Sequence, residues 1–122
     1  AALRAAGAGE DEARVARNLA AVRFDRGDYA GAARAFESLL AQLPRTATPE
    51  RASTLQNLAA ARSMIGEHEL ALAAYRESLE LGSTLGNDDT IARALAGLGA
   101  SHARLGHADL ALTYLEQAVA LR

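Results

Sequence analysis

Few side chains in this sequence could do chemistry, and their spacing does not bring them together. The three histidines are His68, His102 and His107. His102 and His107 are five residues apart, which places them on different faces of a helix, and a glycine turn at Gly106 separates them. His102 is therefore interpreted as a packing residue between helices, and no metal site is expected.

The remaining polar residues also lack a catalytic arrangement. Aspartates and glutamates are scattered along helix faces that are expected to be exposed, so no two of them form an acid–base pair inside a pocket. No serine, histidine and aspartate follow a known hydrolase pattern, and no glycine-rich loop is placed to hold a phosphate. The sequence therefore predicts a protein that is not an enzyme and that has no catalytic residue and no cofactor.

Composition favours a single all-α domain. The chain has 122 residues, half of them apolar, and it is rich in alanine, the strongest helix former. The net charge of -2 argues against direct nucleic-acid binding. No apolar run approaches the roughly 20 residues that a membrane span needs. Cysteine is absent, which excludes disulfides, and a cytoplasmic location is expected.

A repeat becomes visible when Gly27, Gly66 and Gly106, which are 39 and 40 residues apart, are placed in register. Five columns of residues then keep their size class, in the order large, small, small, large, large. The columns are Leu19, Leu58 and Leu98; Ala20, Ala59 and Gly99; Ala32, Ala71 and Ala111; Phe36, Tyr75 and Leu115; and Leu40, Leu79 and Val119. Small residues let two helix backbones approach closely, and the large residues fill the space beside them. Each copy is therefore expected to be a pair of antiparallel helices joined by a glycine turn.

The predicted helices occupy residues 10–26 and 29–43, 49–65 and 68–81, and 90–105 and 108–121. They form three repeats, 10–47, 48–87 and 88–122, and residues 1–9 are expected to be the tail of a preceding repeat or a disordered segment. Asp28 is placed to cap the second helix, and Thr48 followed by Pro49 marks the start of the third. The link from Gly82 to Asn87 leaves room for an extra helical turn before Gly86.

The best-preserved copy carries Leu95, Leu98-Gly99, Leu105-Gly106, Ala111-Leu112, Leu115 and Ala118. This series resembles the tetratricopeptide repeat, whose helix–turn–helix unit of about 34 residues has the pattern W-x2-L-G-x2-Y…A-x3-F…P. Leu95 stands in the tryptophan place and His102 in the tyrosine place. The longer spacing here is similar to the extended repeats of kinesin light chains and of large bacterial signal-transduction ATPases and transcriptional regulators. The resemblance implies a right-handed α-solenoid of three repeats, with about six helices, as one part of a larger protein.

In that family the first helix of each repeat lines a concave groove that binds proteins or peptides. By resemblance, the polar residues that face the groove are Arg14, Arg17, Gln56, Asn57, Arg93 and Arg104, set among Ala21, Phe24, Ser53, Ala60, Met64, Ala96, Gly97 and Ala100. The arginine guanidinium groups favour an acidic partner, because they pair with carboxylates.

A sharper resemblance concerns family members that bind the C-terminal carboxylate of chaperones with five groove residues. Arg17, Asn57 and Arg93 match three of these places, but Ala21 and Gly97 occupy the other two, so the clamp is incomplete. The Asn57 amide either bonds the backbone of a bound peptide, as the corresponding asparagine does in the extended repeats, or belongs to an ordinary polar helix residue.

The main hypothesis is a non-catalytic scaffold that presents this groove to a peptide or a partner domain. One alternative is the sensor or regulatory region of a multidomain bacterial transcriptional or signalling regulator. Another is a homo-oligomerisation module that self-associates through the C-terminal helix, because residues 108–121 carry more apolar side chains than one buried face needs. Those side chains are Leu110, Leu112, Tyr114, Leu115 and Val119.

Overall fold

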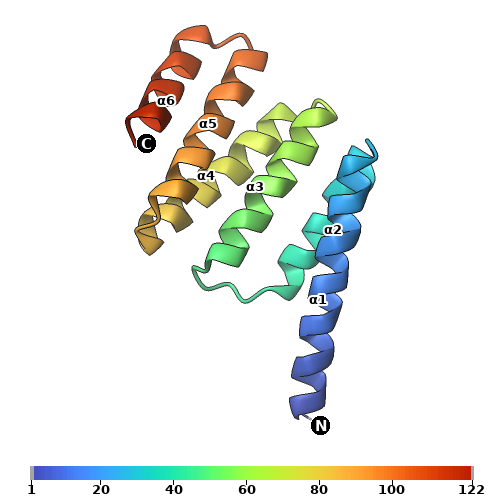
Figure 1. The fold of residues 1–122 in the computed structure, drawn as a ribbon. Helices are drawn as coiled ribbons and strands as arrows, with labels where there is room; N and C mark the ends of the chain where they lie inside the picture. The colour runs from blue at the N-terminus through green and yellow to red at the C-terminus, as the bar shows by residue number, and fades with distance from the viewer. Residues whose placement is uncertain (1, 122) are drawn as a thin grey trace.

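The computed structural model describes residues 2–121, with side chains described for residues 11–121. The helices within that range are α1 (Ala2–Asp25), α2 (Tyr29–Gln42), α3 (Pro49–Met64), α4 (His68–Leu85), α5 (Asp88–Arg104) and α6 (Ala108–Ala120). Consecutive helices pair into three hairpins, α1–α2, α3–α4 and α5–α6, which lie side by side in chain order (Figure 1). No strand occurs among the described residues, and the predicted all-α repeat architecture with six helices is confirmed.

The turn inside each hairpin depends on a glycine. Gly27, Gly66 and Gly106 have φ angles of 83°, 84° and 84°, in the left-handed region that other residues rarely adopt. After the first glycine, the amide of Asp28 donates to the carbonyl of Arg23 at 2.8 Å, which satisfies an oxygen that the end of α1 leaves unpaired. The other two turns repeat this bond, so the three hairpins turn in the same way.

Three helices begin at a side-chain cap. Asp28, Thr48 and Asn87 each accept a hydrogen bond, at 3.0 to 3.1 Å, from the backbone amide three residues further on. These bonds satisfy amides that the first turns of α2, α3 and α5 leave without a helical partner. The caps predicted at Asp28 and Thr48 are confirmed.

Helix α1 is longer than the sequence indicated. It begins at Ala2, whereas the prediction placed its start at residue 10 and left residues 1–9 outside it. The helix runs through Gly7 and Gly9 because the flanking residues are mostly alanines, whose helix propensity offsets the roughly 1 kcal/mol that each glycine costs. The assignment of residues 1–9 to a preceding repeat stays a prediction, since their side chains lie outside the described residues.

Helix α4 is also longer than the predicted range 68–81. It continues to Leu85 and ends at Gly86, whose φ is 63°, so the extra helical turn belongs to the helix itself. The added turn brings Gly82 against the start of α5. A Cβ at Gly82 would lie 3.2 Å from the backbone nitrogen of Ile91, so the glycine allows the two helices to approach closely.

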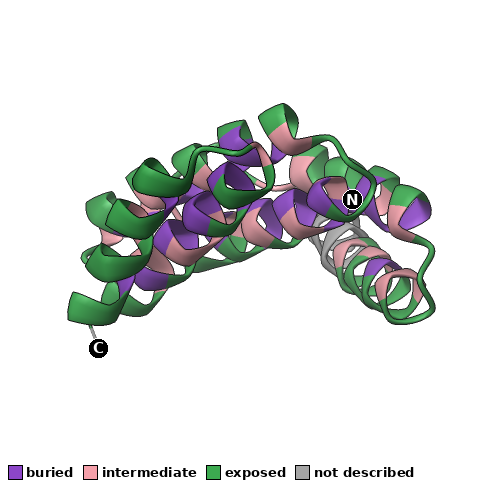
Figure 2. Cartoon of the chain, turned by 90° about the horizontal axis from the view of Figure 1, so that it is seen from above, coloured by how far each residue is buried: buried purple, intermediate pink, exposed green. Residues whose placement is uncertain are grey.

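The core is a thin seam between neighbouring helices, and small residues make the seam narrow. Ala20, Ala32 and Ala59 are fully buried at the places where two helices meet. Gly99 shares the column of Ala20 and Ala59, and a Cβ there would lie 2.7 Å from the side chain of Leu115 on α6. Figure 2 shows that the buried residues lie on the sides of the helices that face neighbouring helices. None of the described helices is long and apolar enough to cross a membrane.

The leucine column offers a graded test of this seam. Leu58 of α3 and Leu98 of α5 are buried, whereas their counterpart Leu19 on α1 is 47% exposed. Leu58→Ala and Leu98→Ala should each lower the free energy of unfolding by about 2–5 kcal/mol, because truncation removes buried methyl groups and leaves a cavity. Leu19→Ala should cost less than about 1 kcal/mol. Urea unfolding of dilute protein measures the three values, and equal losses would contradict the seam described here.

Candidate binding groove on the first helices

A hollow of about 200 Å³ opens between α1 and α3. It is lined by Ala21, Phe24 and Asp25 from α1, Phe36 from α2, and Asn57 and Ala60 from α3. The ring of Phe24 meets the ring of Tyr29 edge-on, with centroids 5.0 Å apart, which fixes one wall. Ala21 and Ala60 end in methyl groups, so they leave the space between the two helices unfilled. We call this site the α1–α3 hollow.

The α1–α3 hollow overlaps the predicted groove only in part. Four of its lining residues, Ala21, Phe24, Asn57 and Ala60, are among those predicted to face a groove on the first helices. Phe36 had been assigned to a core column, which agrees with its burial. Asp25 was missed, because an exposed aspartate at a helix end carries no pattern that would mark it.

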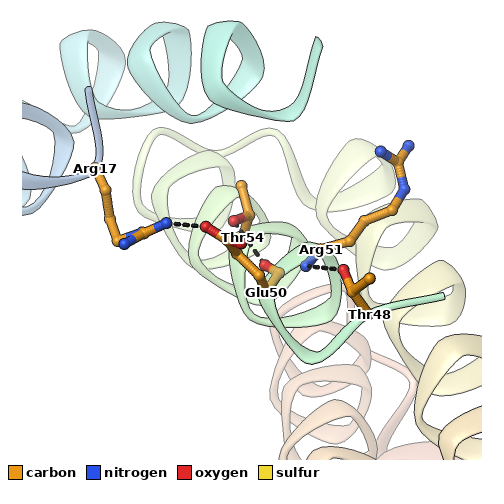
Figure 3. A network of polar contacts seen from close by, with 5 residues as sticks. All are labelled: Arg17, Thr48, Glu50, Arg51 and Thr54. Atoms are coloured by element: carbon orange, nitrogen blue, oxygen red, sulfur yellow. Dashed lines mark hydrogen bonds and ion pairs between the residues drawn. The ribbon is translucent and has the colours of Figure 1, made fainter. Parts of the chain in front are cut away.

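An arginine connects the two helices beside the hollow. Arg17 of α1 forms an ion pair with Glu50 in the first turn of α3 (Figure 3). The same turn is ordered by two further bonds, because Thr48 caps the helix and Oγ1 of Thr54 donates to the Glu50 carbonyl at 2.8 Å. Glu50 is therefore presented to Arg17 from a well-defined helix start.

The other predicted arginines do not gather around the α1–α3 hollow. Their contacts are Arg14 with Asp11 at 2.9 Å, Arg93 with Asp89 at 3.3 Å, and Arg104 with Oγ of Ser63 at 2.5 Å. Arg93 and Arg104 are separated by about three turns of α5, which is about 16.5 Å along its axis at about 1.5 Å per residue. These arginines therefore do not converge on a single carboxylate.

The two neighbouring amides of α3 have different surroundings. Nε2 of Gln56 donates to Oγ of Ser78 on α4 at 2.8 Å and to the carbonyl of Thr90 on α5 at 3.0 Å. Gln56 thus ties three helices together, and its amide nitrogen is already used within the fold. Asn57, by contrast, is exposed and lines the α1–α3 hollow.

This contrast predicts different costs for truncating the two amides. Gln56→Ala should lower the free energy of unfolding by about 1–3 kcal/mol, because it removes both hydrogen bonds at a half-buried position. Asn57→Ala, at the adjacent exposed position, should change it by less than about 0.5 kcal/mol. Urea unfolding measures both variants, and a stability of Gln56→Ala equal to that of the wild type would show that these bonds contribute nothing.

The comparison with family models decides how the repeats are classified. A model described as tetratricopeptide repeat matches the chain twice, over residues 11–84 and 50–122. The chain belongs to the tetratricopeptide repeat (TPR) family. TPR repeats in general serve protein–protein interaction, so in this broad sense the chain is a protein-interaction scaffold.

A solved TPR structure has the same fold. It is the N-terminal domain of stress-induced protein-1 (STI-1) from C. elegans, which matches with a TM-score of 0.75 and 16% sequence identity. The match covers 93% of this chain and 87% of that chain. At this identity the likeness concerns the fold alone. The comparison with curated proteins found no match.

The last TPR hairpin brings His102 and His107 together, so the inference from their spacing was wrong. The turn at Gly106 folds α6 back onto α5, and the two Nδ1 atoms lie 3.1 Å apart. His102 is buried and stacks on Tyr114, with ring centroids 5.5 Å apart and 7° between the planes, which confirms its packing role. Over the described part of the chain, no three side chains of the metal-binding types are grouped closely enough to hold an ion.

The surroundings of His102 predict a pH dependence of stability. Burial lowers the pKa of His102 below its ordinary value of 6.5, His107 and Arg76 lower it further, and Glu69 opposes them. The unfolded chain therefore binds this proton more readily than the folded chain. Stability should fall as the pH drops from about 6.5 towards the lower pKa of the folded state, and this contribution should stop changing below it.

Unfolding measurements at about pH 7.5 and about pH 5.5 test this. His102→Phe, which keeps a ring on Tyr114, should reduce the loss of stability at the lower pH. An unchanged pH dependence in His102→Phe would show that His102 is not its source.

Proposed function

We propose that this TPR domain binds an extended peptide segment of a partner protein at the α1–α3 hollow. The observation that supports the proposal is an apolar hollow which the chain's own side chains leave unfilled and which has the exposed Asn57 on its wall. The peptide inserts one apolar side chain between Phe24 and Phe36, and the Asn57 amide bonds the peptide backbone. The α1–α3 hollow, rather than the arginines, is the centre of the proposed site.

The proposed contacts are modest in free energy. Burial of one large aliphatic side chain contributes about 1.5–3 kcal/mol, and a hydrogen bond to the peptide backbone adds about 1 kcal/mol. Ordering the peptide offsets part of this gain, so these two contacts alone should give a Kd weaker than about 1 mM. Tighter binding needs further contacts along the first helices.

Arg17 favours a peptide in which an acidic residue stands next to the apolar residue. Its ion pair with Glu50 is exposed at both ends and contributes at most about 1 kcal/mol. A peptide carboxylate can therefore replace Glu50 at little cost and form a forked pair with the guanidinium group. The cytoplasmic location and the role as a regulatory region of a larger bacterial protein stay predictions.

The proposal is tested with capped heptapeptides of glycine and serine that carry a central leucine, with or without an adjacent aspartate. Backbone amide shifts of the labelled protein are followed during titration. We expect saturable shifts around the α1–α3 hollow, a weaker effect when alanine replaces the leucine, and tighter binding when the aspartate is present. Shifts that are confined to other parts of the chain would overturn the proposal.

The repeat provides a matched pair of variants. Ala60→Leu fills the α1–α3 hollow and should weaken binding by at least about tenfold, because it removes the space for the peptide side chain. Ala100 stands in the same register on α5, and Ala100→Leu should leave binding unchanged. Arg17→Glu should weaken only the aspartate-containing peptide. Equal effects of the two leucine variants would place binding elsewhere.

A further inference from the structure

Helices α1 and α6 lie at opposite ends of the row of hairpins (Figure 1). Each of them carries an exposed apolar stripe. The α1 stripe consists of Val15, Leu19 and Val22, with exposures between 47% and 63%. The α6 stripe consists of Leu112, Leu115 and Val119, with exposures between 40% and 73%. In both stripes the residues are spaced three or four apart, so each occupies one face of its helix. Contiguous exposed apolar surface of this kind marks an interaction surface.

Residues in register with the α1 stripe are buried in the other two repeats. They are Thr54, Leu58 and Ala61 on α3, and Ala94, Leu98 and Ser101 on α5, and none is more than 5% exposed. Leu58 and Ala61 cluster with Phe36 of α2, the second helix of the preceding hairpin. The α1 stripe is therefore the face of a first helix that receives a preceding second helix.

Residues in register with the α6 stripe face the following hairpin. They are Ala33, Phe36 and Leu40 on α2, and Leu72, Tyr75 and Leu79 on α4. Ala33 and Phe36 belong to the cluster that includes Leu58 of α3, and the ring of Tyr75 lies over Gly97 of α5. The α6 stripe is therefore the face of a second helix that receives a following first helix.

The two stripes are thus the two halves of an interface that already occurs twice within the chain, where α2 packs on α3 and where α4 packs on α5. We propose that copies of this chain associate head to tail, with the α6 stripe of one copy packed on the α1 stripe of the next in the register of α2 on α3. The partner that fits either end is accordingly a second copy of the chain.

The apolar fit can be followed at Val119. Its counterpart Leu40 packs against the clusters that contain Leu55 and Leu58 of α3. In register, Leu55 and Leu58 correspond to Ala16 and Leu19 of α1. Ala16 and Leu19 line a shallow depression on α1 together with Val15, and Asp11 and Glu12 stand at its rim. Val119 of one copy is therefore placed to fill this depression on the next.

The charges follow the same register. At the α2–α3 interface, Arg62 forms an ion pair with Glu37. Arg23 of α1 stands in register with Arg62, and Glu116 of α6 stands in register with Glu37. Among the side chains that the structure describes, Arg23 has one distant ion-pair partner, Asp28 at 3.9 Å. Head-to-tail packing therefore places Glu116 of one copy opposite Arg23 of the next.

This pattern favours head-to-tail over tail-to-tail pairing. In a symmetric contact between two α6 stripes, Glu116 of one chain would lie near Glu116 of the other, and the two negative charges would repel. Both α1 stripes would stay exposed. A head-to-tail contact uses different surfaces on the two partners, so one free stripe remains at each end and further copies can add. Association is then open-ended, and the mean mass should rise steadily with concentration.

Sedimentation velocity of the wild-type chain from about 10 μM to about 1 mM tests the proposal. The range extends to high protein concentration because a contact between two single helix faces is expected to be weak. The mean mass should increase past that of a dimer. Leu19→Glu on α1 and Val119→Glu on α6 should each weaken self-association by at least about tenfold, because each buries a carboxylate in the contact. Leu70→Glu is the matched control, since Leu70 is 48% exposed but lies outside both stripes, and it should associate as the wild type does.

Mixing the two variants separates head-to-tail from symmetric pairing. The Leu19→Glu chain keeps an intact α6 stripe, and the Val119→Glu chain keeps an intact α1 stripe. Their mixture should form a one-to-one heterodimer that does not grow, although neither variant associates alone. Circular dichroism of each variant checks that the helices are intact. If Leu19→Glu alone still dimerises, the contact is symmetric and the proposal fails.

A charge exchange tests the register. Glu116→Arg and Arg23→Glu should each weaken association, and the chain that carries both changes should recover most of the loss. A wild-type chain that stays monomeric across the concentration range overturns the proposal. No recovery in the double variant overturns the stated register. These outcomes are independent of peptide binding at the α1–α3 hollow, because that binding is measured at a protein concentration too low for self-association.

Discussion

The close approach of neighbouring helices is the constraint on which the rest of this structure depends. It requires a small residue wherever two backbones meet, and buried alanines such as Ala20 and Ala59, with Gly99 in the third repeat, meet this requirement. Because the seam is narrow, a single leucine or aromatic ring in each neighbouring column is enough to span it. The α1–α3 hollow lies outside this seam, where Ala21 and Ala60 line its wall with methyl groups alone.

Features that depend on neighbours in the chain could be predicted from the sequence. The glycine turns, the cap at Asp28 and the cap at Thr48 each involve residues within one turn of helix, so their chemistry is visible in a short stretch. The columns of similar side-chain size could be recognised because the helices pack in the same way in each of the three repeats. Helix ends were less certain, since the start of α1 reflects a balance between alanine and glycine propensities that no single residue decides.

Features that depend on distant residues could not be read in this way. The helical period correctly placed Gln56 on a first helix, but only the fold shows that its amide is taken up by Ser78 and Thr90, 22 and 34 residues further on. Spacing along one helix is also a poor guide across a turn, which is why His102 and His107 were judged to be apart although the turn brings their rings into contact. The predicted set of groove arginines came from family resemblance. In the structure Arg14 and Arg93 pair within their own helices, whereas Arg17 and Arg104 bind side chains of α3.

The exposed face of α6 has a consequence for how the chain opens. A row of hairpins that contact only their neighbours behaves like a one-dimensional chain of coupled units, so its stability is a sum of local terms. The middle hairpin is coupled on both sides, whereas α6 buries only Ala111 and Ala118 and rests on the stack between His102 and Tyr114. Opening of α6 therefore costs less free energy than opening of the central hairpin, and amide protons of α6 exchange with solvent more readily than those of α3. The molecule thus combines a central hairpin that is held on both sides with a C-terminal helix that separates more easily.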